Sequence, residues 1–144
     1  MLTTAAKVRQ LAIWPSTVTD DMLALHLASA ARDLRRWMRS IDEDLYDALI
    51  AADDDDADRL AAEEIEGCLT IAYALPPLNS FVMADAPSVP KRVEDAEFQF
   101  LDHEQAEKLA ASWRDRAEKR FASWDWTDEG EEETGEAKSP WYAV

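Results

Sequence analysis

The sequence is poor in the residues from which most catalytic and metal sites are built. Its 144 residues include one cysteine, two histidines and three glycines. Cys68 alone cannot form a disulfide within one chain or a cysteine-based zinc site, and a reducing, cytosolic setting is expected. His26 and His103 lack a ligand spacing such as H-E-x-x-H, and the glycines are too scattered for a phosphate loop. The sequence therefore predicts no enzyme, no metal site and no cofactor.

Long apolar runs are also lacking. No stretch approaches the ~18–20 apolar residues of a membrane-spanning helix, and the first residues lack the apolar core of a signal peptide. We therefore expect a soluble intracellular protein that makes no membrane contact. Glycine is rare whereas alanine, leucine, glutamate and arginine are abundant, which favours helices over strands. A chain of this length fits one domain with a hydrophobic core.

Apolar residues recur at three- and four-residue spacing in five segments, which predicts five helices. The segments run from Thr3 or Thr4 to about Ile13, from Thr19 to about Ile41, over 42–52, from the acidic run at 53–58 to Pro76-Pro77, and from about His103 to Trp124. The expected N-caps of the first three helices are Thr3 or Thr4, Thr19 and Asp42. The two prolines should stop the fourth helix, because a proline lacks the N–H that a helix interior needs. The predicted fold class is all-α: a small bundle of about five helices in one domain, residues 1–126.

Two further segments are predicted to be extended. Residues 76–92 hold four of the six prolines, so we expect a Pro-rich arm over 76–100 within the helical domain. Phe98 and Phe100 alternate in this segment and fit a short strand or the start of a helix. Residues 127–144 form an acidic tail with an aromatic tip. We expect the tip to bind another subunit, the portal or an adjacent copy, through Pro140, Trp141, Tyr142 and Val144. The alternative is that the tip folds back on its own subunit.

The net charge of −16 is spread unevenly along the chain. Residues 1–40 carry six basic and three acidic side chains, whereas residues 42–66 carry twelve acids and a single arginine. An acidic protein is a poor candidate for binding DNA phosphates. The basic end of the second helix is instead expected to pair with acids of its own subunit or of a neighbour. The subunit-interface candidates are Arg32, Arg35, Arg36, Arg39, Asp53, Asp54, Asp55 and Asp56.

The acidic run also invites a calcium interpretation, which its spacing does not support. An EF-hand loop that started at Asp53 would place Asp58 where glycine is required, and a start at Asp54 would place Ile65 where the final glutamate is required. We therefore interpret these acids as the cap and first turn of the fourth helix. Glu64 is the one carboxylate predicted to lie inside an apolar stripe. Paired with an arginine such as Arg35 it would be structural, and alone it would be an acid with a raised pKa, without a visible partner for catalysis.

The order of the helices resembles a known family. A short N-terminal helix, a long capped helix (TDDMLALHLASAARDLRRWM) and a helix that ends in CLTIAYALPPL resemble the head–tail connector, or head-completion adaptor, proteins of tailed bacteriophages. The resemblance covers about residues 1–80 and includes Tyr73-Ala74-Leu75-Pro76 at the end of the core helix.

This resemblance implies a structural role in the virion neck, after assembly in the bacterial cytoplasm. Such proteins form a homo-oligomeric ring, commonly twelve-fold, beneath the portal protein. The ring extends the DNA channel, lets DNA pass without specific binding, and offers a platform for the next neck or tail protein.

The charge distribution by itself fits a second function. A small acidic interaction module, or an inhibitor that masks a basic partner, would use the acidic block at 42–66 as its binding surface. A third interpretation of the same charge is plain acidic solubility. The sequence leaves these alternatives open beside the structural one.

Overall fold

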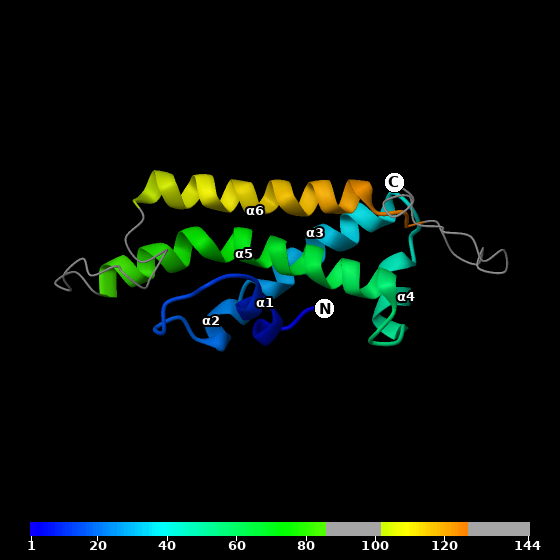
Figure 1. The fold of residues 1–144 in the computed structure, drawn as a ribbon, viewed down its shortest axis with the longest axis horizontal. Helices are drawn as coiled ribbons and strands as arrows, with labels where there is room; N and C mark the ends of the chain where they lie inside the picture. Colours follow the sequence, from blue (N-terminus) through cyan, green and yellow to red (C-terminus); the bar gives the residue numbers. More distant parts are fainter. Residues whose placement is uncertain (86–101, 127–144) are drawn as a thin grey trace.

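The computed structural model describes residues 1–85 and 102–126, with the backbone alone for 81–85. This part of the chain contains six helices and no strand, which confirms the all-α fold class (Figure 1). The helices are α1 (Ala5–Leu11), α2 (Asp20–Ala24), α3 (Leu27–Arg39), α4 (Leu45–Ala51), α5 (Ala57–Asp85) and α6 (His103–Ser123).

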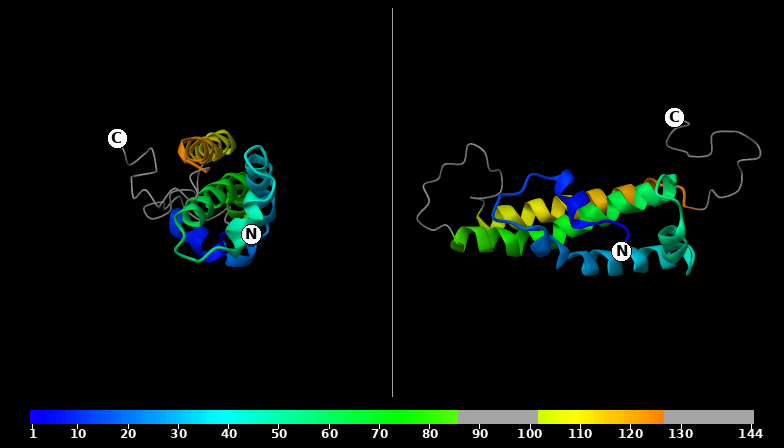
Figure 2. Two further views of the ribbon diagram at one scale, coloured as in Figure 1. Left: turned by 90° about the vertical axis from the view of Figure 1, so that its right-hand side faces the viewer. Right: turned by 90° about the horizontal axis from the view of Figure 1, so that it is seen from below.

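Helix α5 is the centre of the bundle. It has 29 residues, about 43 Å of helix, and α6 lies along it in every view (Figures 1 and 2). Its first half packs with α3 and α4 around Ile65 and Leu69. Its second half packs with α1 and α2 around Ile71 and Leu75. Because α5 contributes to both clusters, it joins the two halves of one hydrophobic core.

The predicted N-terminal caps are confirmed at two helices. The Thr4 hydroxyl accepts a hydrogen bond from the backbone N–H of Lys7, and that of Thr19 accepts one from Met22, both at 3.2 Å. These bonds satisfy N–H groups that have no partner inside the helix. The first helix ends at Leu11, two residues before the predicted end.

The single long helix predicted from Thr19 to about Ile41 is wrong, because it is divided into α2 and α3 at residues 25–26. The backbone N–H of His26 turns back to the carbonyl of Leu23 at 3.1 Å. Leu23 and Leu27 are both buried on either side of this turn, while Leu25 remains 76% exposed. The apolar spacing continues through the break, so the sequence pattern does not reveal it.

The start of α4 also differs from the prediction. Asp42 does not cap this helix: the N-cap residue is Asp44, whose side chain makes no capping hydrogen bond. The Asp42 carboxylate instead accepts a hydrogen bond from the backbone N–H of Asp44 at 2.8 Å. Such a local bond stabilises a turn in place of a helix start. Helix α4 therefore begins at Leu45, three residues later than predicted.

The predicted helix stop at Pro76-Pro77 is wrong, because α5 continues through both prolines to Asp85. The prolines deprive two carbonyls of their helix donors. Leu75 and Leu78, on either side, are buried against α6 residues such as Ala110. This tertiary packing outweighs the free-energy cost of placing two prolines inside a helix. Tertiary contacts commonly override the intrinsic helix propensity of single residues in this way. The predicted extended arm over 76–100 is therefore helical over its first ten residues; its remainder, including Phe98 and Phe100, lies outside the described residues.

The last helix is confirmed almost to the residue. It begins with a capping box, in which the Asp102 carboxylate accepts from the Gln105 N–H at 2.7 Å and the Gln105 side chain accepts from the Asp102 N–H at 3.0 Å. This reciprocal pair is a strong start signal. The acidic tail at 127–144 lies outside the described residues.

Because α5 continues beyond the prolines, we expect two nearby substitutions in it to change the free energy of unfolding by different amounts. Leu78→Ala should lower the free energy of unfolding by about 2–4 kcal/mol, because it leaves a cavity in the packed core. Ser80→Ala, at an exposed position two residues later, should change it by less than about 0.5 kcal/mol. Urea unfolding of both variants measures the difference. Equal, small effects would contradict the packing of this part of α5.

Candidate functional site

The arginines of α3 pair with acids of their own subunit, one of them within the acidic block at 42–66. Arg36 contacts Asp33 at 2.9 Å, and Arg35 contacts Asp47 of α4 at 3.1 Å. Arg32 lies 3.8 Å from the same Asp33 carboxylate. None of the ion pairs in the described residues joins these arginines to 53–56. The structure therefore gives part of the arginine cluster a role inside the subunit.

Three of these arginines form a row on the surface. Arg32, Arg36 and Arg39 follow one another at four- and three-residue spacing, which places them on the same face of α3. The Arg32 and Arg36 side chains remain 64% and 66% exposed beside Asp33, and Arg39 is exposed as well. We call this row the arginine stripe. Helix α3, which carries the stripe, lies at one edge of the bundle in the end view of Figure 2.

The acids at 53–56 divide into two roles. Asp56 caps α5, since its carboxylate accepts from the backbone N–H of Arg59 at 3.0 Å, which confirms the cap interpretation. Asp53, Asp54 and Asp55 are exposed, and Asp54 lies 3.6 Å from the Arg59 guanidinium.

Within 1–85 and 102–126, no three histidine, cysteine or acidic side chains are grouped so that they could hold a metal ion.

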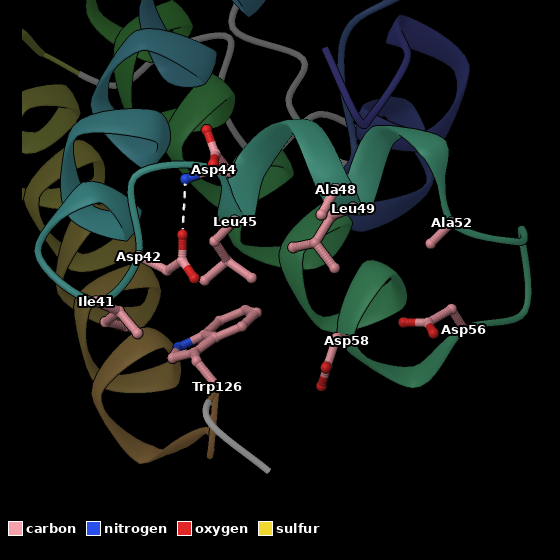
Figure 3. Close-up of a pocket in the computed structure, with 10 residues that line it drawn as sticks. All are labelled: Ile41, Asp42, Asp44, Leu45, Ala48, Leu49, Ala52, Asp56, Asp58 and Trp126. Atoms are coloured by element: carbon pink, nitrogen blue, oxygen red, sulfur yellow. Dashed lines mark hydrogen bonds between the residues drawn. The ribbon is translucent and has the colours of Figure 1, made fainter. Parts of the chain in front are cut away.

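A groove that the sequence did not predict lies where the α3–α4 turn, α4 and the start of α5 meet the end of α6 (Figure 3). Its volume is about 490 Å³. The side chains that line it are of two kinds, carboxylates and apolar groups. The carboxylates are Asp42, Asp44, Asp56 and Asp58, and the apolar residues include Ile41, Leu45, Leu49 and Trp126. We call this feature the acidic groove.

The aromatic residues after α6 close the groove. The Trp126 indole N–H donates to the carbonyl of Phe121 at 2.9 Å, and the ring packs against Phe121 with centroids 5.4 Å apart. The Trp124 indole N–H donates to Asp58 at 2.7 Å, which ties this segment to the start of α5. These bonds fix the position of Trp126 in the groove. The only sequence signal was the pair of tryptophans directly after the last helix.

The sequence pattern also misses three buried carboxylates, Asp33, Glu63 and Glu66. The prediction for Glu64 holds only in that this residue pairs with an arginine. Glu64 is half-exposed and contacts Arg120 of α6 at 3.2 Å, not Arg35. The fully buried acid is Glu66, which accepts hydrogen bonds from the backbone N–H groups of Leu2 and Thr3, both at 2.8 Å, and from the Tyr46 hydroxyl. Glu66 therefore holds the N-terminal segment and α4 against α5.

Asp33 connects three helices in a similar way. It is 2% exposed and contacts Arg36 of its own helix, Tyr73 of α5 and Arg114 of α6. Burial would raise the pKa of Asp33, but hydrogen bonds from Tyr73 and Arg114 and the charges of both arginines lower it below its usual value. Asp33 is therefore held as an ion with donors on both oxygens.

Glu66 differs from Asp33 because no cationic side chain contacts it among the described residues. Burial raises the pKa of Glu66, and its three hydrogen bonds offset this only in part. Burial also raises the pKa of Tyr46, and the hydrogen bond to Glu66 raises it further. All the donors around Glu66 come from elements that pack on α5. The arrangement serves packing rather than proton transfer to a bound molecule.

The remaining single residues of interest occupy structural positions. His26 is the N-cap residue of α3, and burial lowers its pKa. His103 begins α6 and lies 3.6 Å from Glu107. Cys68 is buried in the core. They belong to different parts of the bundle and form no common site with one another.

Comparison with known proteins adds no relative. No protein family model, no curated protein and no solved structure matches this chain. None of the helices in the described part of the chain is long and apolar enough to cross a membrane.

The buried Glu66 predicts a specific dependence of stability on pH. Its pKa in the folded state lies above the ordinary value of 4.5, so the folded state binds more protons than the unfolded state between these values. Stability from this group is therefore present at low pH and lost as pH rises through the folded-state pKa. Relative to Glu66→Gln, the unmodified protein should become more stable as pH falls toward 4.5.

Urea unfolding of both proteins at several pH values measures this difference. Glu66→Ala is the second comparison. It leaves two buried N–H groups and the Tyr46 hydroxyl without an acceptor, and should cost about 3–5 kcal/mol, well above the cost of Glu66→Gln. A difference between the unmodified protein and Glu66→Gln that stays constant with pH would refute this description of Glu66.

Proposed function

We propose that the protein is a structural adaptor of a tailed-bacteriophage neck. In this role it forms a ring, twelve-fold as is common in that family, beneath the portal protein. The ring extends the DNA channel and binds the next neck or tail protein. The protein acts in the virion neck after assembly in the host cytoplasm, without a catalytic step.

The observation that carries this proposal is the separation of two oppositely charged surfaces on one subunit. The arginine stripe remains exposed on α3, while Asp53, Asp54 and Asp55 remain exposed before α5. A ring requires such a pair of different surfaces, because each copy contacts its neighbour head to tail. The stripe of one copy facing the acids of the next would close the ring through charge complementarity.

Exposed apolar side chains have the same two-sided distribution. Ile13 and Leu25 flank α2 and are 58% and 76% exposed. Ile50 of α4 and Leu60 of α5 are 40% and 48% exposed and belong to the other end of the bundle, as the places of α2 and α4 in Figure 1 indicate. Apolar side chains on two different regions supply the cores that two unlike contact surfaces need.

The order of helices also supports the proposal. A short α1, a capped α2–α3 segment and a long core helix α5 follow one another as the resemblance to connector proteins implies. The point of resemblance that places the end of the core helix at Tyr73-Ala74-Leu75-Pro76 does not hold, because α5 continues to Asp85. The net charge of −16 suits a conduit through which DNA slides without being held.

The aromatic tip belongs to the same proposal. Trp141 and Tyr142 follow an acidic stretch that is long enough to act as a tether, and burial of two aromatic side chains contributes several kcal/mol at about 25 cal/mol per Å². We propose that Pro140, Trp141, Tyr142 and Val144 bind the portal protein or an adjacent copy.

Native mass spectrometry of the protein with and without its portal protein tests the proposal. We expect a defined ring of copies on the portal, even if the free protein is a monomer. Arg32→Glu with Arg39→Glu should prevent this assembly, because it reverses the charge of the stripe. Lys108→Glu with Lys119→Glu is the matched control, since both lysines are exposed on α6 outside the stripe.

Deletion of residues 137–144 forms a further arm of the same experiment. It should weaken assembly on the portal while the melting temperature of the isolated protein stays unchanged. A folded monomer that ignores the portal under all conditions would overturn the proposed function. Equal loss of assembly in the stripe variant and in the α6 control would overturn the role of the stripe.

A further inference from the structure

The acidic groove combines an apolar floor with a negatively charged rim. Leu49 and Trp126 form the floor and are nearly buried, while Ile41 at the edge is 38% exposed. Asp42 and Asp44 stand on one side and Asp56 and Asp58 on the other (Figure 3). Among the described residues that line the groove there is no lysine or arginine. The described lining of the groove therefore supplies no cation to the rim.

The rim carboxylates keep capacity for further donors. Asp42 and Asp56 each accept one backbone hydrogen bond through a single oxygen, Oδ1. Asp44 is the N-cap residue of α4, yet its side chain makes no capping bond. An ionised carboxylate has two oxygens that accept from several donors. Three acids around one cavity therefore offer acceptor positions suited to ammonium or guanidinium groups.

The floor of the groove is fixed before anything binds. Trp126 is held by its hydrogen bond to Phe121 and by ring contacts with Phe121 and Trp124. Trp124 is itself held by Asp58. A preformed apolar surface lowers the cost of ordering on binding. The volume of the acidic groove, about 490 Å³, is in the range of sites that hold a few side chains.

We propose that the acidic groove is a docking site for a short cationic segment of a partner protein, one that presents lysine or arginine side chains beside a large apolar side chain. The cationic groups meet Asp42, Asp44 and Asp56, and the apolar side chain rests between Ile41, Leu45 and Trp126. Residues 128–136 of this chain are the wrong occupant, because they carry six acids and no basic residue. The proposal concerns the single subunit and does not depend on ring formation or on the portal.

The probe is a fluorescein-labelled hexapeptide in which lysine and leucine alternate, added to the full-length chain. Fluorescence anisotropy should show saturable binding that weakens as salt rises, since the rim contacts are exposed. A peptide with glutamate in place of lysine should not bind, and one with serine in place of leucine should bind more weakly. In a nitrogen-15 NMR spectrum, the peptide should shift the amides of Ala48 and Ala52 and the Trp126 indole.

Two pairs of substitutions remove the same charge from neighbouring positions. Asp44→Asn with Asp56→Asn takes two charges from the rim and should weaken binding about fivefold, while asparagine retains the ability to cap a helix. Asp54→Asn with Asp55→Asn is the matched control, because these exposed acids do not line the groove. Ile41→Ser tests the apolar part and should also weaken binding.

Several results would overturn the proposal. Equal weakening in the two aspartate pairs would show that the peptide responds only to overall charge. NMR shifts outside the groove, or no binding at about 1 mM peptide, would show that the groove is not the site. Self-association of the protein that Ile41→Ser abolishes, with no peptide binding, would assign the groove to a second copy. None of these outcomes depends on whether the portal binds, so this proposal and the proposed function fail separately.

Discussion

The burial of α5 is the constraint on which the rest of the structure depends. From Ala61 to Ile71 this helix is almost entirely enclosed, with Glu64 as the half-exposed exception. A helix that is buried on all sides must satisfy any polar group it carries. Glu66 is satisfied by the N-terminal backbone and Tyr46, and Tyr73 by Asp33. These bonds determine where the N-terminus, α3 and α4 lie against α5.

The acidic chain uses its carboxylates in two different ways. Asp33 and Glu66 are buried and hold helices together, whereas Asp53 to Asp55 and part of the acidic groove face outward. The outward acids and the arginine stripe remain for contacts with other molecules, and exposed pairs of this kind contribute specificity more than stability. A rigid bundle with unlike charged surfaces is suited to assembly, and the proposals for ring and groove both rest on this division.

The sequence predicts local features well and long-range ones poorly. Thr4 and Thr19 cap helices because their side chains bond to backbone groups three residues away, and such short-range chemistry is visible in the pattern. The prolines of α5 give a wrong prediction of where the helix ends, because packing against α6 keeps the chain helical beyond them. The sequence pattern points to Glu64 instead of Glu66, because an apolar stripe does not identify the buried positions of a helix that is enclosed on almost all sides. The acidic groove escaped prediction because it joins residues 41–58 to Trp126.

Disulfide cross-linking on the portal tests the central claim, that unlike surfaces of neighbouring copies meet, most directly. One population carries Arg39→Cys in the stripe and the other Asp54→Cys in the acidic surface. Burial raises the pKa of the native Cys68 thiol to about 11, which keeps it unreactive. If unlike surfaces meet, disulfides should form between the two populations and few within either. Disulfides mainly within one population, or none in an assembled ring, would contradict it.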